Sequence, residues 1–285
     1  MSIPAFIKDH SLWTFFIVTF AISWGGLLLV IGGPAGITGA SGQFDALLPF
    51  VIMALLAGPS TAGLLLSGLI GGREGLRGFL SRLIRWRVGA RWYAIALFAA
   101  PFLFMAILLV LFLFSSKFLP GILAAKDKSS HLIMGLATGL MAGVFEELGW
   151  TGFATPSLRR RFGVFSTGLI LGIVWAIWHL LPAFWLGFAS GTIRGTLSFI
   201  SYLLDPFLFL VVFRILIVWV CDRTGSLFVA VLMHISLTSS SRIFMPLGIV
   251  GMPLLAFDLA WATLMWIIVA KIAIGDKKRF VEETP

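Results

Sequence analysis

The chain has 285 residues, of which 59% are hydrophobic and 12% are charged, and it carries a formal net charge of +9. This composition excludes an ordinary soluble domain, in which about 25% of the residues are charged. The basic residues lie in short segments between apolar runs, so the charge indicates membrane topology and no nucleic-acid partner is expected. The single cysteine, Cys221, excludes an internal disulfide and a cysteine-based metal cluster.

Apolar runs of membrane-spanning length follow one another along the chain and predict an all-α, polytopic integral membrane protein with about eight transmembrane helices. The runs cover residues 12–31, 47–70, 92–114, 131–150, 165–186, 198–220, 226–245 and 253–274. We interpret residues 1–285 as a single membrane domain, in which region 131–245 carries the motifs described below. The first run has no small-residue cleavage site after it, which favours a transmembrane helix over a signal peptide.

Lys and Arg residues are unevenly distributed among the segments that connect these runs. The basic segments at 73–91, 159–161 and 277–279 share one side of the membrane if the spans alternate in direction. Positively charged connections remain in the cytoplasm, so both termini are predicted to be cytoplasmic, with the protein in the plasma membrane. The stretch 72–93 also carries apolar residues at helical spacing, so it is predicted to lie along the inner membrane surface.

Ionisable side chains within the predicted spans are few, and each costs about 2.5–3.5 kcal/mol to insert. They are Glu146, Glu147, His179, Asp205, Arg214, His234 and Asp258. Asp205 and Arg214 are nine residues apart and therefore on opposite faces of one helix, so they do not form an obvious pair. Together with Asp258 they are interpreted as structural residues that find other partners or reach the membrane interface.

The fourth predicted span carries a stripe of glycines spaced four residues apart, which allows close approach of a neighbouring helix. The stripe consists of Gly135, Gly139 and Gly143, and Glu146 continues it. Glu147 is rotated by one residue step, so the two carboxylates are expected to have different roles. Glu146 is the one predicted to act in the chemistry.

Two further spans point polar groups toward a neighbouring helix. A second glycine stripe, in the fifth span, continues to Trp175 and His179, and in the seventh span His234 shares a small, polar face with Thr238. Glu146 and His234 both fall about 10 Å from the cytoplasmic boundary at a rise of 1.5 Å per residue. Carboxylate and imidazole groups from separate helices therefore predict a site built inside the bilayer.

Two chemical routes suit such a site. A carboxylate in apolar surroundings acts as a general base on water, with a histidine orienting the water and another polar group holding the oxyanion. Alternatively, Glu146, His179 and His234 form a suitable ligand set for catalytic Zn²⁺, which keeps a fourth position for water. The chain has no HExxH motif, so spacing alone does not indicate a metal. Both routes lead to hydrolysis of a carbonyl bond.

The site residues resemble the motifs of the CPBP family of intramembrane proteases, also called Abi, which includes the type II CAAX prenyl endopeptidases. The resemblance lies in EELGWTGFATPSL from Glu146, WAIWH ending at His179 and MHISLT around His234. In that family an arginine follows the second glutamate by four residues, an aromatic residue precedes the first histidine by four, and asparagine or aspartate follows the second histidine by four.

The resemblance implies an intramembrane hydrolase, either a metalloprotease or a glutamate-dependent endopeptidase. Its substrate would be a peptide or protein in or at the membrane, including a lipidated one, with lipids around it. Glu146 would be the general base and Glu147 would support the site. His179 would help to activate the water, and His234 would stabilise the oxyanion or bind metal.

Three positions depart from the family pattern. Thr151 stands in place of the arginine, Thr238 in place of the asparagine, and Trp175 where phenylalanine is usual. Thr238 retains a hydroxyl donor beside His234, whereas Thr151 cannot replace the charge of an arginine. The threonines favour an alternative function, a non-proteolytic bacteriocin-immunity or binding protein of the same family. A proton-coupled transporter is a further alternative, because Glu and His within spans also form proton relays.

Overall fold

The computed structural model describes residues 7–39 and 41–275, so the basic residues 277–279 lie outside it. Eight helices in this part of the chain are long and apolar enough to cross a membrane, and no strand occurs among the described residues. The helices are α2 (Ser11–Val30), α4 (Phe44–Leu83), α5 (Ala90–Phe112), α7 (Lys128–Gly149), α9 (Val164–Ala189), α10 (Thr196–Thr224), α11 (Leu227–Phe244) and α12 (Met252–Gly275). The prediction of an all-α, multi-pass integral membrane protein is confirmed.

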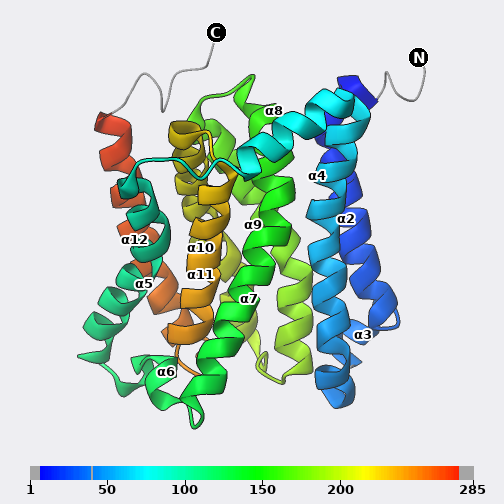
Figure 1. Cartoon of the computed structure of the whole chain (residues 1–285). Coiled ribbons are helices and arrows are strands. Elements are labelled where there is room, and N and C mark those ends of the chain that lie inside the picture. Colours follow the sequence, from blue (N-terminus) through cyan, green and yellow to red (C-terminus); the bar gives the residue numbers. More distant parts are fainter. Residues whose placement is uncertain (1–6, 40, 276–285) are drawn as a thin grey trace.

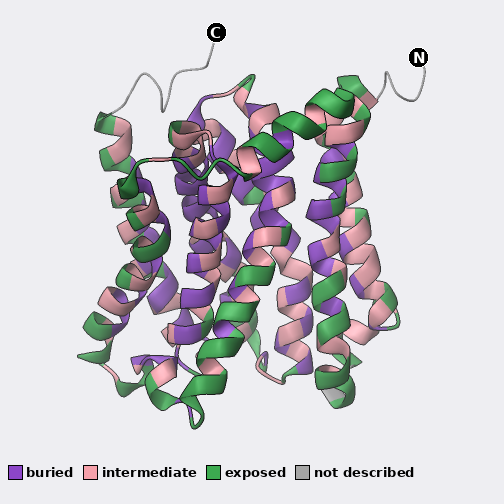
Figure 2. Cartoon of the chain, viewed as in Figure 1, coloured by how far each residue is buried: buried purple, intermediate pink, exposed green. Residues whose placement is uncertain are grey.

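The spanning helices lie side by side in one bundle, and the short elements α3 (Gly36–Gly39) and α6 (Gly121–Ala124) lie toward the same end of it (Figure 1). Their inward faces are buried, while their outward faces are largely exposed (Figure 2). The exposed side chains include large apolar ones, such as Leu29 at 84% and Phe102 at 72% exposure. Lipid is the solvent that suits such an outer surface, because its tails are as apolar as these side chains.

Glycine stripes set the distance between the helices that carry the predicted site. A Cβ atom on Gly139 of α7 would lie 2.0 Å from Ser239 Oγ and 2.7 Å from the Ile235 carbonyl oxygen, both on α11. On α9, a Cβ on Gly168 would lie 2.5 Å from the Cα of Ile215 on α10. Only glycine permits these approaches, so both predicted stripes are helix contact faces.

The basic stretch after the second span forms the end of α4 and runs across one end of the bundle (Figure 1). Gly72 has φ 56° and breaks the helix between its spanning part and this crossing part. In the crossing part, Phe79 is buried at 1% exposure and Arg82 donates a hydrogen bond of 2.7 Å to the Gly152 carbonyl. The stretch predicted to follow the membrane surface is therefore also docked on the segment just after the glutamate pair.

Candidate active site

The glutamate pair lies in the last turn of α7, just before the helix widens. After Gly149, residues Trp150–Ala154 form a π-helical turn, and α8 (Thr155–Arg159) continues from it. Single π-helical turns inside α-helices are frequent at functional sites. A Cβ on Gly149 would lie 2.3 Å from the Pro59 carbonyl oxygen, so the turn is pressed against α4. This packing holds Glu146 and Glu147 at 4% and 0% exposure.

Glu147 is surrounded by hydrogen-bond donors from three directions. His234 Nδ1 on α11 lies 2.7 Å from Oε1, and Arg214 NH1 on α10 lies 2.9 Å from both carboxylate oxygens. The hydroxyl of Thr151, in the π-helical turn, also donates to Oε2. Glu147 and Arg214 are both fully buried, so their opposite charges compensate one another away from solvent. Glu147 thereby ties α7, α10 and α11 together.

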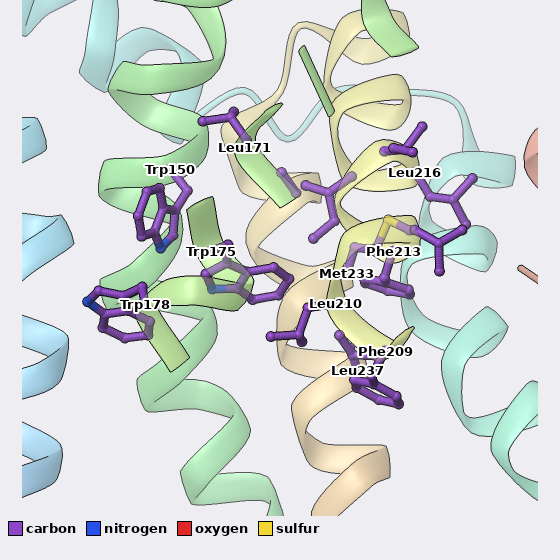
Figure 3. Packing of buried hydrophobic residues seen from close by; sticks show 14 of the residues in the cluster. Trp150, Leu171, Trp175, Trp178, Phe209, Leu210, Phe213, Leu216, Met233 and Leu237 are labelled. Atoms are coloured by element: carbon purple, nitrogen blue, oxygen red, sulfur yellow. The ribbon is translucent and has the colours of Figure 1, made fainter. Parts of the chain in front are cut away.

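Glu146 has a different environment. Its Oε2 accepts a hydrogen bond of 2.7 Å from the indole Nε1 of Trp175 on α9. The same indole lies 4.0 Å below the guanidinium carbon of Arg214, measured to the ring centroid, and its centroid is 5.2 Å from that of His234. Trp175 is buried at 1% exposure, and Figure 3 shows it within the packed core. The two carboxylates thus face different partners, connected through one indole.

The histidine hydrogen bonds indicate which ring nitrogen faces the site. His179 Nδ1 lies 2.9 Å from the Trp175 carbonyl oxygen, which can only accept, so Nδ1 carries the proton and Nε2 is left for other partners. His234 Nδ1 faces the Glu147 carboxylate, which is likewise an acceptor. The centroid of the His179 ring lies 5.3 Å from that of Trp175. Both imidazoles therefore border the same indole, and Nε2 is the ring nitrogen that these hydrogen bonds leave unused.

The structure brings together most of the residues that the sequence singles out. Glu147 and His234 are in direct contact, whereas Glu146 and His179 are joined through Trp175. Thr238 lies one turn after His234 on α11 and is half-buried. Its role as a donor stays a prediction.

Arg214 finds its partner on another helix. The sequence predicts a structural residue that does not pair with Asp205, and in the structure Arg214 forms a buried ion pair with Glu147. The sequence does hold a signal for this pair. Arg214 is the only Lys or Arg well inside the predicted spans, and a glutamate pair within a span requires a compensating positive charge. Asp205, nine residues earlier on α10, indeed has other neighbours, as the helical spacing predicted.

The proposed zinc ligands do not form a ready-made ligand set. Among the described residues, no three His, Cys, Asp or Glu side chains are grouped so that they could hold a metal ion. Glu146 faces the Trp175 indole, and His179 directs Nδ1 to a carbonyl of its own helix.

Comparison with known proteins points to one family. Residues 127–239 match the sequence model of the family described as type II CAAX prenyl endopeptidase Rce1-like. A protein named CAAX prenyl protease 2, from Methanococcus maripaludis, is 29% identical over 151 residues. This match covers 50% of the chain and 50% of that protein, so about half the length of the curated relative is represented. Residues 127–239, which match the family model, include both glutamates, both histidines and Arg214.

Proposed function

We propose, on the premise that residues 127–239 are a CPBP-family segment of the Rce1-like type, that the protein is an intramembrane endopeptidase. One observation carries the proposal: the two adjacent glutamates have different partners. Glu147 is engaged by Arg214, Thr151 and His234, whereas Glu146 receives a single hydrogen bond, on Oε2, among the described residues. Glu146 Oε1 is therefore the oxygen suited to take a proton from water.

The reaction uses Glu146 as the general base. Glu146 accepts a proton from water, and the water oxygen forms a bond to the carbonyl carbon of the peptide. Because Nδ1 of His234 is hydrogen-bonded to Glu147, the other ring nitrogen, Nε2, is the one that acts in this step. In the neutral imidazole, Nε2 accepts a hydrogen bond from the water. In the imidazolium, Nε2 donates a hydrogen bond to the oxyanion. Thr238 supplies a second donor to the oxyanion. The carbon–nitrogen bond then breaks as the proton passes from Glu146 to the departing amine.

The substrate we propose is a membrane-associated peptide that carries a lipid. His234 lies seven residues into α11, which places it about 10 Å below the start of this helix, so the peptide has to enter the bilayer. The apolar surroundings of the site suit a hydrocarbon chain, and the name of the Methanococcus relative points to prenylated CAAX peptides. The basic end of the bundle, with Arg159 and the crossing part of α4, would face the cytoplasm, with both termini there and the protein in the plasma membrane.

The test uses the purified full-length chain in detergent with a fluorescent farnesylated CAAX peptide and the same peptide without farnesyl. Glu146→Gln and His234→Ala are each expected to abolish cleavage. Matched controls are Glu74→Gln, on the exposed crossing part of α4, and His131→Ala, near the opposite end of the bundle. Both controls should retain activity. Undiminished turnover in Glu146→Gln and His234→Ala would sink the proposal.

The zinc route is tested separately by metal analysis of the wild type beside His179→Ala. Stoichiometric zinc that is lost in His179→Ala would support metal binding. Active protein without bound metal would contradict it.

The non-proteolytic immunity or binding role keeps one supporting observation, the threonine at position 238. If this role is correct, Glu146→Gln would still confer protection on cells that express it, whereas an endopeptidase requires the carboxylate. The buried guanidinium of Arg214 beside Glu147 weakens the part of this alternative that depends on Thr151.

A further inference from the structure

We propose that Arg214 is a positioning residue of this site. In the CPBP motif an arginine stands where this chain has Thr151, and Arg214 supplies the corresponding guanidinium from α10. The inference rests on the proposed function, because it assigns Arg214 a part in the chemistry of Glu146 and His234. It concerns a residue outside the motifs themselves. Three contacts of Arg214 carry it.

The first contact is with the Glu147 carboxylate, to which Thr151 also donates a hydrogen bond. Thr151 lies one helical turn after Glu147 and donates to its Oε2, and Arg214 NH1 lies 2.9 Å from that same oxygen. Arg214 NH1 is also 3.5 Å from Thr151 Oγ1. Thr151 and Arg214 therefore donate hydrogen bonds to the same Glu147 carboxylate from two separate helical segments. Because the interior is closely packed, the small threonine leaves the volume that the guanidinium occupies.

The second contact is with Trp175, which stands where the family usually has phenylalanine. The Arg214 guanidinium carbon lies 4.0 Å from the indole centroid, within the range of a strong cation–π contact. Tryptophan is the best aromatic partner for such a contact, and the same indole donates to Glu146. Thr151 and Trp175, two of the departures from the motif, thus both touch Arg214. They are parts of one rearrangement in which the arginine has moved to another helix.

The third link leads from Arg214 to the reacting groups. Arg214 is fully buried, so it acts through Glu147 and not by touching the substrate. With its NH1 between the two carboxylate oxygens, Arg214 fixes the plane of Glu147, and Glu147 Oε1 in turn holds His234 Nδ1. The direction of His234 Nε2 therefore depends on Arg214. Loss of the guanidinium should lower kcat much more than it changes KM.

The experiment moves the arginine back. Arg214→Leu in the full-length protein, assayed with the farnesylated peptide, is expected to lower kcat about 100-fold with KM changed less than about threefold. Arg214→Lys keeps the charge and should lose less. The double variant Thr151→Arg with Arg214→Leu is expected to regain at least about tenfold over Arg214→Leu.

Folding controls keep the result interpretable. Arg159→Leu, which breaks the ion pair with Asp222 at 2.8 Å near the basic end, removes an arginine without a link to Glu147 and should leave kcat unchanged. Melting temperatures in detergent identify variants that fail to fold. If the double variant fails to fold, Arg214→Lys decides. The inference is overturned if folded Arg214→Leu keeps wild-type kcat, or if both Arg214→Lys and the folded double variant are no better than Arg214→Leu.

A readout without turnover separates this inference from the proposed function. In protein labelled with ¹⁵N-histidine, the His234 resonance, assigned by its loss in His234→Ala, should report a protonated Nδ1 that donates to a carboxylate. Arg214→Leu should shift this resonance, and Arg159→Leu should not. If the wild type cleaves no peptide but the shift occurs, the proposed function fails while the positioning role stands. An unchanged resonance in Arg214→Leu would contradict the positioning role directly.

Discussion

Two clusters of charged residues lie within the helical bundle, and they are built differently. The proximal cluster is Glu147, Arg214 and His234, in which the acid and the guanidinium are fully buried and 2.9 Å apart. The distal cluster is Asp205, Asp258 and Arg242. Here the fully buried carboxyl of Asp258 lies beside the carboxyl of Asp205, and Arg242, whose charge acts on Asp205, is exposed.

The difference separates two reasons for having charge in a membrane span. Arg214 and Asp205 belong to the same helix and are about 14 Å apart along it, at 1.5 Å per residue. In the proximal cluster the hydrogen bonds of Glu147 fix the relative orientation of side chains from three helices, which a catalytic site requires. In the distal cluster Asp258 faces a second carboxyl, that of Asp205, instead of a guanidinium. Charge alone is therefore a poor guide to function, whereas convergent hydrogen bonding is a better one.

The largest effect is expected from removing one member of the buried ion pair. Glu147→Leu and Arg214→Leu should each lower the free energy of unfolding by about 3–5 kcal/mol, because each leaves a buried charge without its partner. The double variant should be less destabilised than the sum of the two. Equilibrium unfolding in mixed detergent and SDS micelles measures these values. If the losses of the two single variants add up strictly in the double variant, Glu147 and Arg214 are not coupled. The proposed contrast with the distal cluster would then be wrong.

Arg242→Leu provides the matched arginine variant from the distal cluster. Because its side chain is exposed, the expected loss is within about 1 kcal/mol by the same measurement. A loss equal to that of Arg214→Leu would show that the distal cluster is also a closed network.

The next largest effect is expected at Trp175, which links Glu146 to the proximal cluster. Trp175→Phe removes the hydrogen bond to the carboxylate, and a hydrogen bond to a charged group contributes about 1.5–3 kcal/mol. We expect kcat/KM for the farnesylated peptide to fall by about 10- to 100-fold. Trp266→Phe, at a position on α12 that is 40% exposed, is the control and should have wild-type kinetics. Equal activity of both variants would remove Trp175 from the site.

A smaller effect is expected from separating α7 and α11, which carry Glu147 and His234. Gly139→Ala introduces a Cβ 2.7 Å from the Ile235 carbonyl oxygen, so the backbones have to move apart at a cost of about 1–3 kcal/mol. Gly78→Ala is the matched control, because a Cβ there has no neighbour within 4 Å. It should be neutral or slightly stabilising. Thermal unfolding in detergent distinguishes the two, and equal melting temperatures would contradict the close contact.

The smallest effect is expected at Asp258. Asp258→Asn replaces one of two neighbouring buried carboxyl groups with an amide that can still donate to Asp205, so the free energy of unfolding should rise or change by less than about 1 kcal/mol. Peptide cleavage should be unaffected. A loss as large as that of Arg214→Leu, in the same SDS titration, would show that Asp258 has an essential partner and would erase the contrast between the clusters.

The spans and their contact faces could be predicted because both are local properties of the sequence. Hydropathy locates the eight helices, and the four-residue spacing around Gly139 locates the face that α11 approaches. The same helical arithmetic correctly excludes a pair between Asp205 and Arg214. The π-helical turn was not predicted, because the packing of Gly149 on Pro59 and of Gly152 on Phe79 involves residues far away in the chain.

Helical spacing could not predict the partner of Arg214, for a physical reason. Helical spacing gives the rotation of a side chain about its own helix, but not the rotation of one helix relative to another. Glu147 and Arg214 are 67 residues apart, and only the assembled bundle brings the Arg214 side chain of α10 to Glu147 on α7. The kinds of side chain expected in the site were therefore predictable, whereas the contacts of Arg214 with Glu147 and Thr151 were not.

The separation of this ion pair along the chain also governs the order of synthesis. When α7 leaves the ribosome, Glu146 and Glu147 enter the membrane 67 residues before the guanidinium that compensates the second of them. An ionised group alone in a span costs about 2.5–3.5 kcal/mol, so α7 is at its least stable in lipid during this interval. We therefore expect α7 to stay beside its earlier neighbour α4 until α10 arrives. Truncation before α10 should leave a chain that is degraded instead of stably inserted.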